Sequence, residues 1–237
     1  MENSPVGSPE PHIRIVEDVS ESLIVRDLLR LINAEPQTSL ELLNYYQEVP
    51  VSAPLTILYA FGDTLFCRTS DSQTRVVQDV KSTLIRAKDL RHPVYARALY
   101  HQETNELELS GFAYVEVLPE RRASIRVRMK GLFQVVIEAG KNRFSGRLRV
   151  LSLHGCAVEI SDRQLLENFT FFYLNMEMPF STFKGKNTAR VMARLLRVDQ
   201  LERCAQCIFM FEHDNTTEDQ VGRLLMQRQT EIIRELK

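Results

Sequence analysis

Residues 146–160, with the sequence GRLRVLSLHGCAVEI, decide how the second half of this chain folds. Gly146 to Leu151 is a candidate strand. His154-Gly155 is a turn signal, and the apolar run from Cys156 to Ile160 follows it as a second strand. The stretch therefore predicts a β-hairpin with a short polar turn.

Other segments with the composition of strands surround this hairpin in the sequence. They are Phe133 to Ala139, Phe169 to Met178, Arg190 to Val198 and Cys204 to Phe211. Six short strands in about eighty residues, without long helices between them, predict a small β-barrel or sandwich.

The end of the chain predicts a helix from Thr216 to Lys237, which Thr216 or Thr217 would cap. An apolar stripe follows helical spacing: Val221, Leu224, Leu225, Ile232 and Leu236. Such a stripe most often packs against its own domain, and a homodimer contact is the alternative.

The first half predicts a smaller α+β domain over residues 13–118. We expect a helix from Ile13 to about Asn33, in which Asp18 caps the start and Glu21 completes a capping box. A second helix is expected from Ser39 to about Gln47. The strand candidates are Leu55 to Phe61, Leu65 to Cys67, one long or two short strands in Thr74 to Ala87, Val94 to Tyr100, and Leu107 to Val117.

The domain boundary is expected at Leu118 to Arg122, where a proline and a charge cluster interrupt the pattern. This places a second domain at residues 119–237. The polar, proline-rich residues 1–12 predict a disordered arm without the features of a signal peptide. No internal repeat is evident in the sequence.

The composition excludes several classes of function. The formal net charge of the 237 residues is −1, so nothing attracts nucleic acid or an anionic membrane globally, and an anion site must be local. No apolar run approaches the ~20 residues needed to span a bilayer. We therefore expect a cytoplasmic protein that binds no nucleic acid.

The sequence offers no catalytic or metal-binding pattern. Cys204 and Cys207 form a lone CxxC, whereas a structural zinc site needs four ligands, so packing is the favoured role of these thiols. The phosphate-loop, HExxH, GxSxG and GxGxxG motifs are all missing, and the histidines have no ligand spacing. We expect neither an enzyme nor a bound cofactor.

Two short elements resemble the motifs of the PilZ domain family. Arg122 and Arg126 match its RxxxR element, and Arg121 matches the arginine that often precedes it. About twenty-five residues later, Ser152 and Gly155 match (D/N)xSxxG, a motif that is followed by a strand. The resemblance covers residues 119–237 and implies a six-stranded β-barrel with a C-terminal helix.

The resemblance also implies a ligand, because PilZ domains are receptors for cyclic di-GMP. Arg121, Arg122 and Arg126, on a flexible entry segment, would grip phosphate or guanine, since guanidinium groups bind both. Ser152 would donate a hydrogen bond, and Gly155 would allow a sharp turn or a close approach of the ligand. The same residues could instead be a solvated linker and ordinary turn residues.

Val150 departs from the family pattern, because it stands where the motif has Asp or Asn. A lost bidentate contact to a base costs about 1–3 kcal/mol. Two functions remain open. One is a cyclic di-GMP receptor that rearranges its domains and signals to a protein partner in motility, pilus or biofilm control. The other is a degenerate module that binds proteins and no nucleotide.

The region upstream loosely resembles the β-rich regulatory domain that precedes PilZ in flagellar-brake-type proteins. This resemblance rests on order and size rather than on a motif. A degenerate PilZ-like barrel from Leu55 to Val117 is the alternative for this region.

Overall fold

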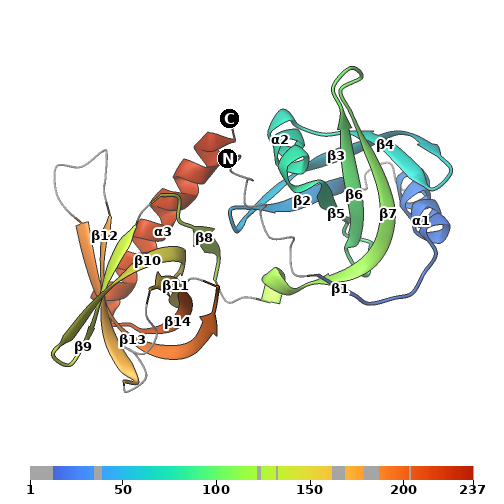
Figure 1. The fold of residues 1–237 in the computed structure, drawn as a ribbon. Helices are drawn as coiled ribbons and strands as arrows, with labels where there is room; N and C mark the ends of the chain where they lie inside the picture. The colour runs from blue at the N-terminus through green and yellow to red at the C-terminus, as the bar shows by residue number, and fades with distance from the viewer. Residues whose placement is uncertain are drawn as a thin grey trace. The chain divides into compact units, whose positions relative to one another are not determined.

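The structure is a computed structural model that describes residues 13–34, 39–121, 124–131, 133–161, 169–178, 187–202 and 204–236. The chain divides into two compact units, Met1–Ala123 with Glu235–Lys237, and Ser124–Arg234. Each unit contains a β-barrel, and each is described by itself below (Figure 1). The expected disordered arm, residues 1–12, lies outside the described residues.

The barrel of the first unit is a closed ring of six antiparallel strands. Pairing runs β2–β3–β4–β7–β6–β5 and returns to β2, and the short strand β1 adds to β7. The strands are β1 (Ile13–Ile15), β2 (Leu40–Tyr46), β3 (Val49–Phe61), β4 (Thr64–Arg68), β5 (Ser82–Arg86), β6 (Val94–His101) and β7 (Glu106–Val117).

Two helices accompany this ring, α1 (Glu21–Ala34) and α2 (Asp71–Val80). The buried face of α1, with Ile24 and Leu28, joins the apolar core of the barrel. A buried polar network holds α2: the Gln73 amide donates to Asn44 Oδ1 over 2.8 Å, and Thr83 donates to the same oxygen over 2.8 Å. Helices and strands together meet the expectation of an α+β domain, and the strands close into a barrel.

Three local expectations for this unit were wrong. The segment expected as a second helix, Ser39 to Gln47, is strand β2, because β3 and β5 pair with its two edges. The segment Thr74 to Ala87 forms most of α2 and then β5, because Ser70 caps a helix there by accepting from the Gln73 N–H. The first helix begins only at Glu21.

The capping box expected for α1 is also not formed by Glu21. Its carboxylate accepts the backbone N–H groups of Gly111 and Phe112, over 2.9 and 3.3 Å. Gly111 has φ +68°, and the register of β7 against β6 shifts there. Glu21 therefore satisfies backbone donors that this irregularity frees from the sheet.

The second unit is a second closed barrel, and its six strands confirm the fold expected for this half. Pairing runs β9–β10–β11–β14–β13–β12 and returns to β9, and the short strand β8 adds to β10. The strands are β8 (Arg126–Arg128), β9 (Gln134–Ala139), β10 (Asn142–Ser152), β11 (Gly155–Ile160), β12 (Phe171–Met178), β13 (Asn187–Gln200) and β14 (Ala205–Glu212).

The two barrels have the same topology. When the six ring strands of each are numbered in chain order, both show the pairs 1–2, 2–3, 3–6, 6–5, 5–4 and 4–1. A barrel in this unit agrees with the closed ring, which begins at β2 rather than at Leu55. The two barrels therefore repeat a backbone topology, although no repeat is evident in their sequences.

The expected C-terminal helix is α3 (Asn215–Glu235), which runs along the second barrel (Figure 1). Its expected stripe is buried at Val221, Leu224, Leu225 and Ile232. Asp214 caps it in place of the threonines: Thr217 N–H donates to Asp214 Oδ1 over 2.7 Å, and this bond lowers the pKa of Asp214. None of the described helices has the length and apolarity required to cross a membrane.

Candidate ligand-binding site

The hairpin predicted from residues 146–160 is formed by β10 and β11, and its turn is closed by Ser152 and Gly155. These two residues are paired in the sheet register. The Ser152 hydroxyl donates to the Gly155 carbonyl over 2.9 Å. In this state the hydroxyl therefore stabilises the turn, while its oxygen can still accept a bond.

Gly155 is required by packing between strands. A Cβ at this position would run into the carbonyl oxygen of Phe209 on β14. Gly155 does not have a positive φ, so the close approach of β14 explains this glycine and a left-handed conformation does not. Since Gly155 is paired with Met210, the motif glycine joins the turn to β14.

Two hydrogen bonds hold the turn residues between Ser152 and Gly155. The Phe211 N–H donates to the His154 carbonyl over 2.9 Å, and Nε2 of His213 bonds the Leu153 carbonyl. Because the Leu153 oxygen can only accept, Nε2 carries the proton. His154 itself is exposed. The turn is therefore presented on a fixed backbone.

Arg126 begins strand β8 and is paired directly with Ser152 on β10. The expectation that Arg126 lies on a free entry segment is therefore wrong. The neighbouring Val127 is fully buried, and this burial fixes β8 on the barrel with Arg126 exposed on the other face. The register thus brings Arg126, Ser152 and Gly155 together.

The other two motif arginines are not placed at this site. Arg121 ends a short 3-10 helix, Leu118–Arg121, and its side chain is not described. Arg122 lies outside the described residues.

A buried arginine, which the sequence analysis did not single out, ties α3 to β8. Arg228 is 5% exposed, and its Nε donates to the Arg128 carbonyl over 3.1 Å. Its Nη1 donates to Glu231 over 3.1 Å. The strand that carries Arg126 is therefore anchored to the C-terminal helix.

The outer face of the hairpin carries further charged residues that the sequence analysis also missed. Arg149 Nε lies 2.6 Å from Glu159 Oε1 across β10 and β11. Arg147 donates from Nε and Nη2 to the Gly131 carbonyl, over 3.3 and 3.2 Å. The sequence signal for this charged face was the alternation of Arg147 and Arg149 in GRLRV, because alternate residues of a strand lie on the same side of the sheet.

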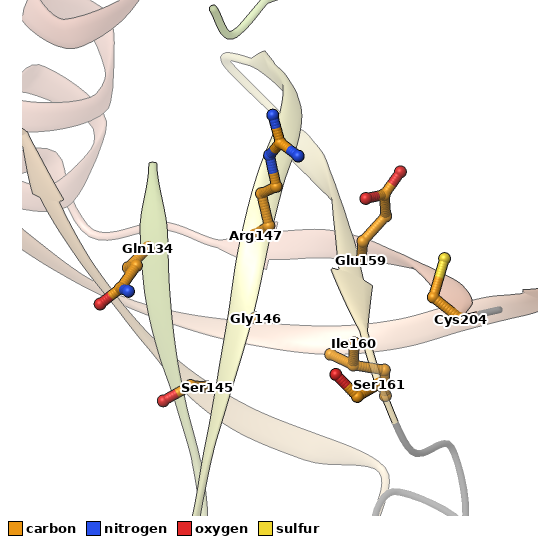
Figure 2. A pocket seen from close by; sticks show the side chains of 8 residues that line it. All are labelled: Gln134, Ser145, Gly146, Arg147, Glu159, Ile160, Ser161 and Cys204. Atoms are coloured by element: carbon orange, nitrogen blue, oxygen red, sulfur yellow. The ribbon is translucent and has the colours of Figure 1, made fainter. Parts of the chain in front are cut away.

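A hollow of about 300 Å³ lies on this face, farther along β10 and β11 than the motif turn. Figure 2 shows the Arg147 side chain rising from β10, with Gln134 on one side and Glu159 on the other. The hollow is lined by Gln134, Ser145, Gly146, Arg147, Glu159, Ile160, Ser161 and Cys204. A positively charged side chain, Arg147, and a negatively charged one, Glu159, thus line the same open hollow together with neutral polar groups.

Val150 is half-buried and is paired with Ala157 on one side and Arg128 on the other. The register shifts between Leu148 and Val150, so Arg149 is an extra residue in β10. Valine and alanine leave this part of the outer face without a polar side chain.

Two cysteines of this barrel, Cys156 and Cys207, are buried, whereas Cys204 lines the hollow. Burial raises the pKa of Cys207 to about 11, with a further rise from Asp199, and burial also raises the pKa of Cys156. Cys204 is half-exposed just before β14. No group of His, Cys, Asp and Glu side chains that could hold a metal ion occurs among the described residues.

The second unit is therefore a closed six-stranded barrel in which Arg126 of β8 lies beside the turn closed by Ser152 and Gly155. The PilZ domain family model matches residues 120–227, so the second barrel is a PilZ domain. No curated protein sequence matches the chain.

Several solved structures align with most of the chain at low identity. YcgR from Escherichia coli in complex with c-di-GMP is 17% identical over 90% of this chain and 93% of that one, with a TM-score of 0.39. The Bacillus subtilis inhibitor of motility is 12% identical over 81% and 96%, with a TM-score of 0.42. The K. pneumonia MrkH–c-di-GMP complex is 15% identical over 94% and 100%, with a TM-score of 0.41.

Proposed function

We propose that this protein is a cyclic di-GMP receptor that binds its ligand on the outer face of β8, β10 and β11. The observation that carries the proposal is the register pairing of Arg126 with Ser152, next to Gly155. Two separate sequence elements of a PilZ domain thereby meet at one place on a fixed backbone.

The charge of this face suits the ligand. Arg126, Arg128, Arg147 and Arg149 lie on β8 and β10, and Glu159 is the acidic residue opposite them on β11. Cyclic di-GMP carries two phosphates, and arginine binds phosphate through charge-assisted, often bidentate hydrogen bonds. A face with this surplus of arginine accounts for an anion site in a chain whose net charge is −1.

The proposed output is a change in the arrangement of the two barrels, which signals to a protein partner. Arg121 and Arg122 precede β8 in the segment that joins the units, so a ligand held by them and by Arg126 would fix that segment. Ordering each residue costs about 1–2 kcal/mol, which the phosphate contacts must offset. Small-angle scattering at saturating ligand should then show a changed radius of gyration.

Val150 favours a second candidate function, a PilZ barrel that binds a protein and no nucleotide. Calorimetric titration of the full chain with cyclic di-GMP separates the two. We expect micromolar or weaker binding with one site per chain, because the contact normally made at the position of Val150 is missing. A titration without heat, together with an unchanged melting temperature at millimolar ligand, would leave only the protein-binding function.

A further inference from the structure

We propose that Glu159 and Arg147 form a guanine-selecting subsite in the hollow that lies farther along β10 and β11 than the motif turn. The inference rests on the proposed function and deepens it, because it names the residues that distinguish one nucleobase from another. The Val150 side chain cannot hydrogen bond to a base, but the same outer face carries the carboxylate of Glu159 on the neighbouring strand β11.

The pair of charges in the hollow matches the two polar edges of guanine. Guanine presents O6 and N7 as acceptors on one edge, which an arginine binds in bidentate fashion. On its Watson–Crick edge, N1–H and the N2 amino group are donors, and a carboxylate accepts both. Arg147 and Glu159 both line the hollow, and the Gln134 amide adds a neutral donor and acceptor.

The neighbouring contacts fix both side chains. Arg147 is held by the Gly131 carbonyl, and Glu159 is held through Oε1 by Arg149. The Glu159 side chain is 19% exposed, so it can still be reached from the hollow. An ordered carboxylate and an ordered guanidinium lose little conformational freedom when a base binds.

The distance along the strand is compatible with one ligand at both places. Glu159 lies four residues after Gly155 on β11, which is about 13 Å at the usual rise per strand residue. A base projects from its ribose-phosphate backbone over much of this distance, and the Glu159 side chain reaches back over part of the rest. Phosphate near Arg126 and a guanine in the hollow can therefore belong to one molecule.

Adenine is the wrong base for this arrangement. It has no hydrogen on N1 and no N2 amino group, and it carries an amino donor where guanine has O6. The Glu159 carboxylate would face the lone pair of adenine N1, and Arg147 would face a donor. The subsite should therefore discriminate cyclic di-GMP from cyclic di-AMP.

The test measures the affinity of the full chain for both cyclic dinucleotides by calorimetry. Glu159→Gln should weaken cyclic di-GMP binding by about tenfold or more, while cyclic di-AMP binding stays the same or improves. Glu159→Asp should restore part of the discrimination, because it keeps the carboxylate. The matched control is Glu138→Gln, since Glu138 also pairs with arginines on the outer face of this barrel, at 3.2 Å from Arg143 and Arg190.

A second readout uses Cys204, which lines the same hollow. Its alkylation rate should fall when cyclic di-GMP is present at saturation, and also with GMP at millimolar concentration, but not in Glu159→Gln. If the wild type binds cyclic di-GMP while Glu159→Gln keeps both its affinity and its base preference, the subsite is wrong and the receptor stands. If cyclic di-GMP does not bind but GMP protects Cys204 through Glu159, the receptor is wrong and the subsite stands.

Discussion

The two barrels of this chain share one hairpin geometry but carry different side chains on it. In β3, Leu58 is an extra residue between the pairs Ile57–Cys67 and Tyr59–Phe66. In β10, Arg149 is the extra residue in the same place, between the pairs Leu148–Val158 and Val150–Ala157. Both hairpins then close three residues later, at Phe61–Thr64 and at Ser152–Gly155. The backbones of β3–β4 and β10–β11 therefore correspond residue by residue.

The outer face of the first hairpin is filled by aromatic rings. Tyr59 and Phe66 stand where the second hairpin has Val150 and Ala157, and their rings stack with centroids 4.6 Å apart. Two carboxylates flank them, since Glu106 pairs with Arg68 at 3.5 Å and Glu108 pairs with His101. Among the described residues around these rings, Arg68 and His101 are therefore each paired with a carboxylate.

The two barrels thus share one backbone topology and differ in the side chains that this face presents. The second hairpin has small side chains at Val150 and Ala157, with Arg128 and Arg149 next to them. Large rings and carboxylates at the corresponding places close the face of the first barrel.

The largest expected effect is on stability, from Gly155→Ala. The new methyl group would meet the Phe209 carbonyl oxygen, and backbone of a barrel strand cannot move aside easily. We expect a loss of about 3 kcal/mol in the free energy of unfolding, measured by urea denaturation. Thr64, which takes this place in the first barrel, already carries a side chain, so Thr64→Ala should change stability by less than about 0.5 kcal/mol.

Gly222→Ala provides a control within the same unit. A Cβ there would lie 3.9 Å from Leu153, which is ordinary contact, and alanine favours a helix over glycine by about 1 kcal/mol. This variant should be at least as stable as the wild type. A Gly155→Ala protein with wild-type stability would contradict the assigned role of Gly155 in strand packing.

The next largest effect is on ligand affinity. It is tested by placing the tyrosine of the first barrel at the corresponding position of the second. Val150→Tyr should weaken cyclic di-GMP binding by about thirtyfold or more, because a ring at this half-buried position would cover the face between Arg126 and Arg149. Val150→Asp should act in the opposite direction by restoring a partner for guanine. Calorimetry measures both, and Tyr59→Val in the first barrel is the control that should leave affinity unchanged.

The sequence predicts some parts of this fold better than others. The β10–β11 hairpin was predicted because its turn residues and its strands are local signals. Strand β2 was mistaken for a helix because Leu40 and Leu43 fit helical spacing, whereas its pairing with β3 and β5 is a long-range contact. Local periodicity does not contain that information.

The candidate site shows the same division between local and long-range information. The motif residues Arg126, Ser152 and Gly155 were named from spacing, but their pairing required the sheet register. Arg228 takes a position of the apolar stripe of α3, and an isolated arginine there gives no indication that it bonds the carbonyl of Arg128. Its partner is a backbone atom a hundred residues away, and no side-chain pattern marks it.

A smaller effect is expected from Arg126→Ala. It removes a charge-assisted contact to phosphate and should weaken cyclic di-GMP binding by about 1.5 kcal/mol, roughly tenfold. Arg14 is the matched control, since it lies exposed on β1, the short strand added to the first barrel. Equal affinities of Arg126→Ala, Arg14→Ala and the wild type would mean that the ligand binds elsewhere.

The smallest effect is a pH dependence that distinguishes the interiors of the two hairpins. Cys67 in the first barrel corresponds to Val158 in the second, and burial raises the pKa of Cys67 to about 12. In the unfolded chain the thiol ionises near pH 8.5, so unfolding releases its proton above that pH. Because the folded-state pKa is raised, the stability from this group is fully present below about pH 8.5 and is lost as pH rises toward 12. The loss in the free energy of unfolding between pH 8 and pH 9 should be about 0.7 kcal/mol.

Cys67→Val places the residue of the second barrel at this position. It should remove the part of the pH dependence that comes from Cys67, while the other buried thiols keep their contributions. Urea denaturation at the two pH values measures the change in the free energy of unfolding. If this change is equal in the variant and the wild type, burial does not raise the pKa of Cys67.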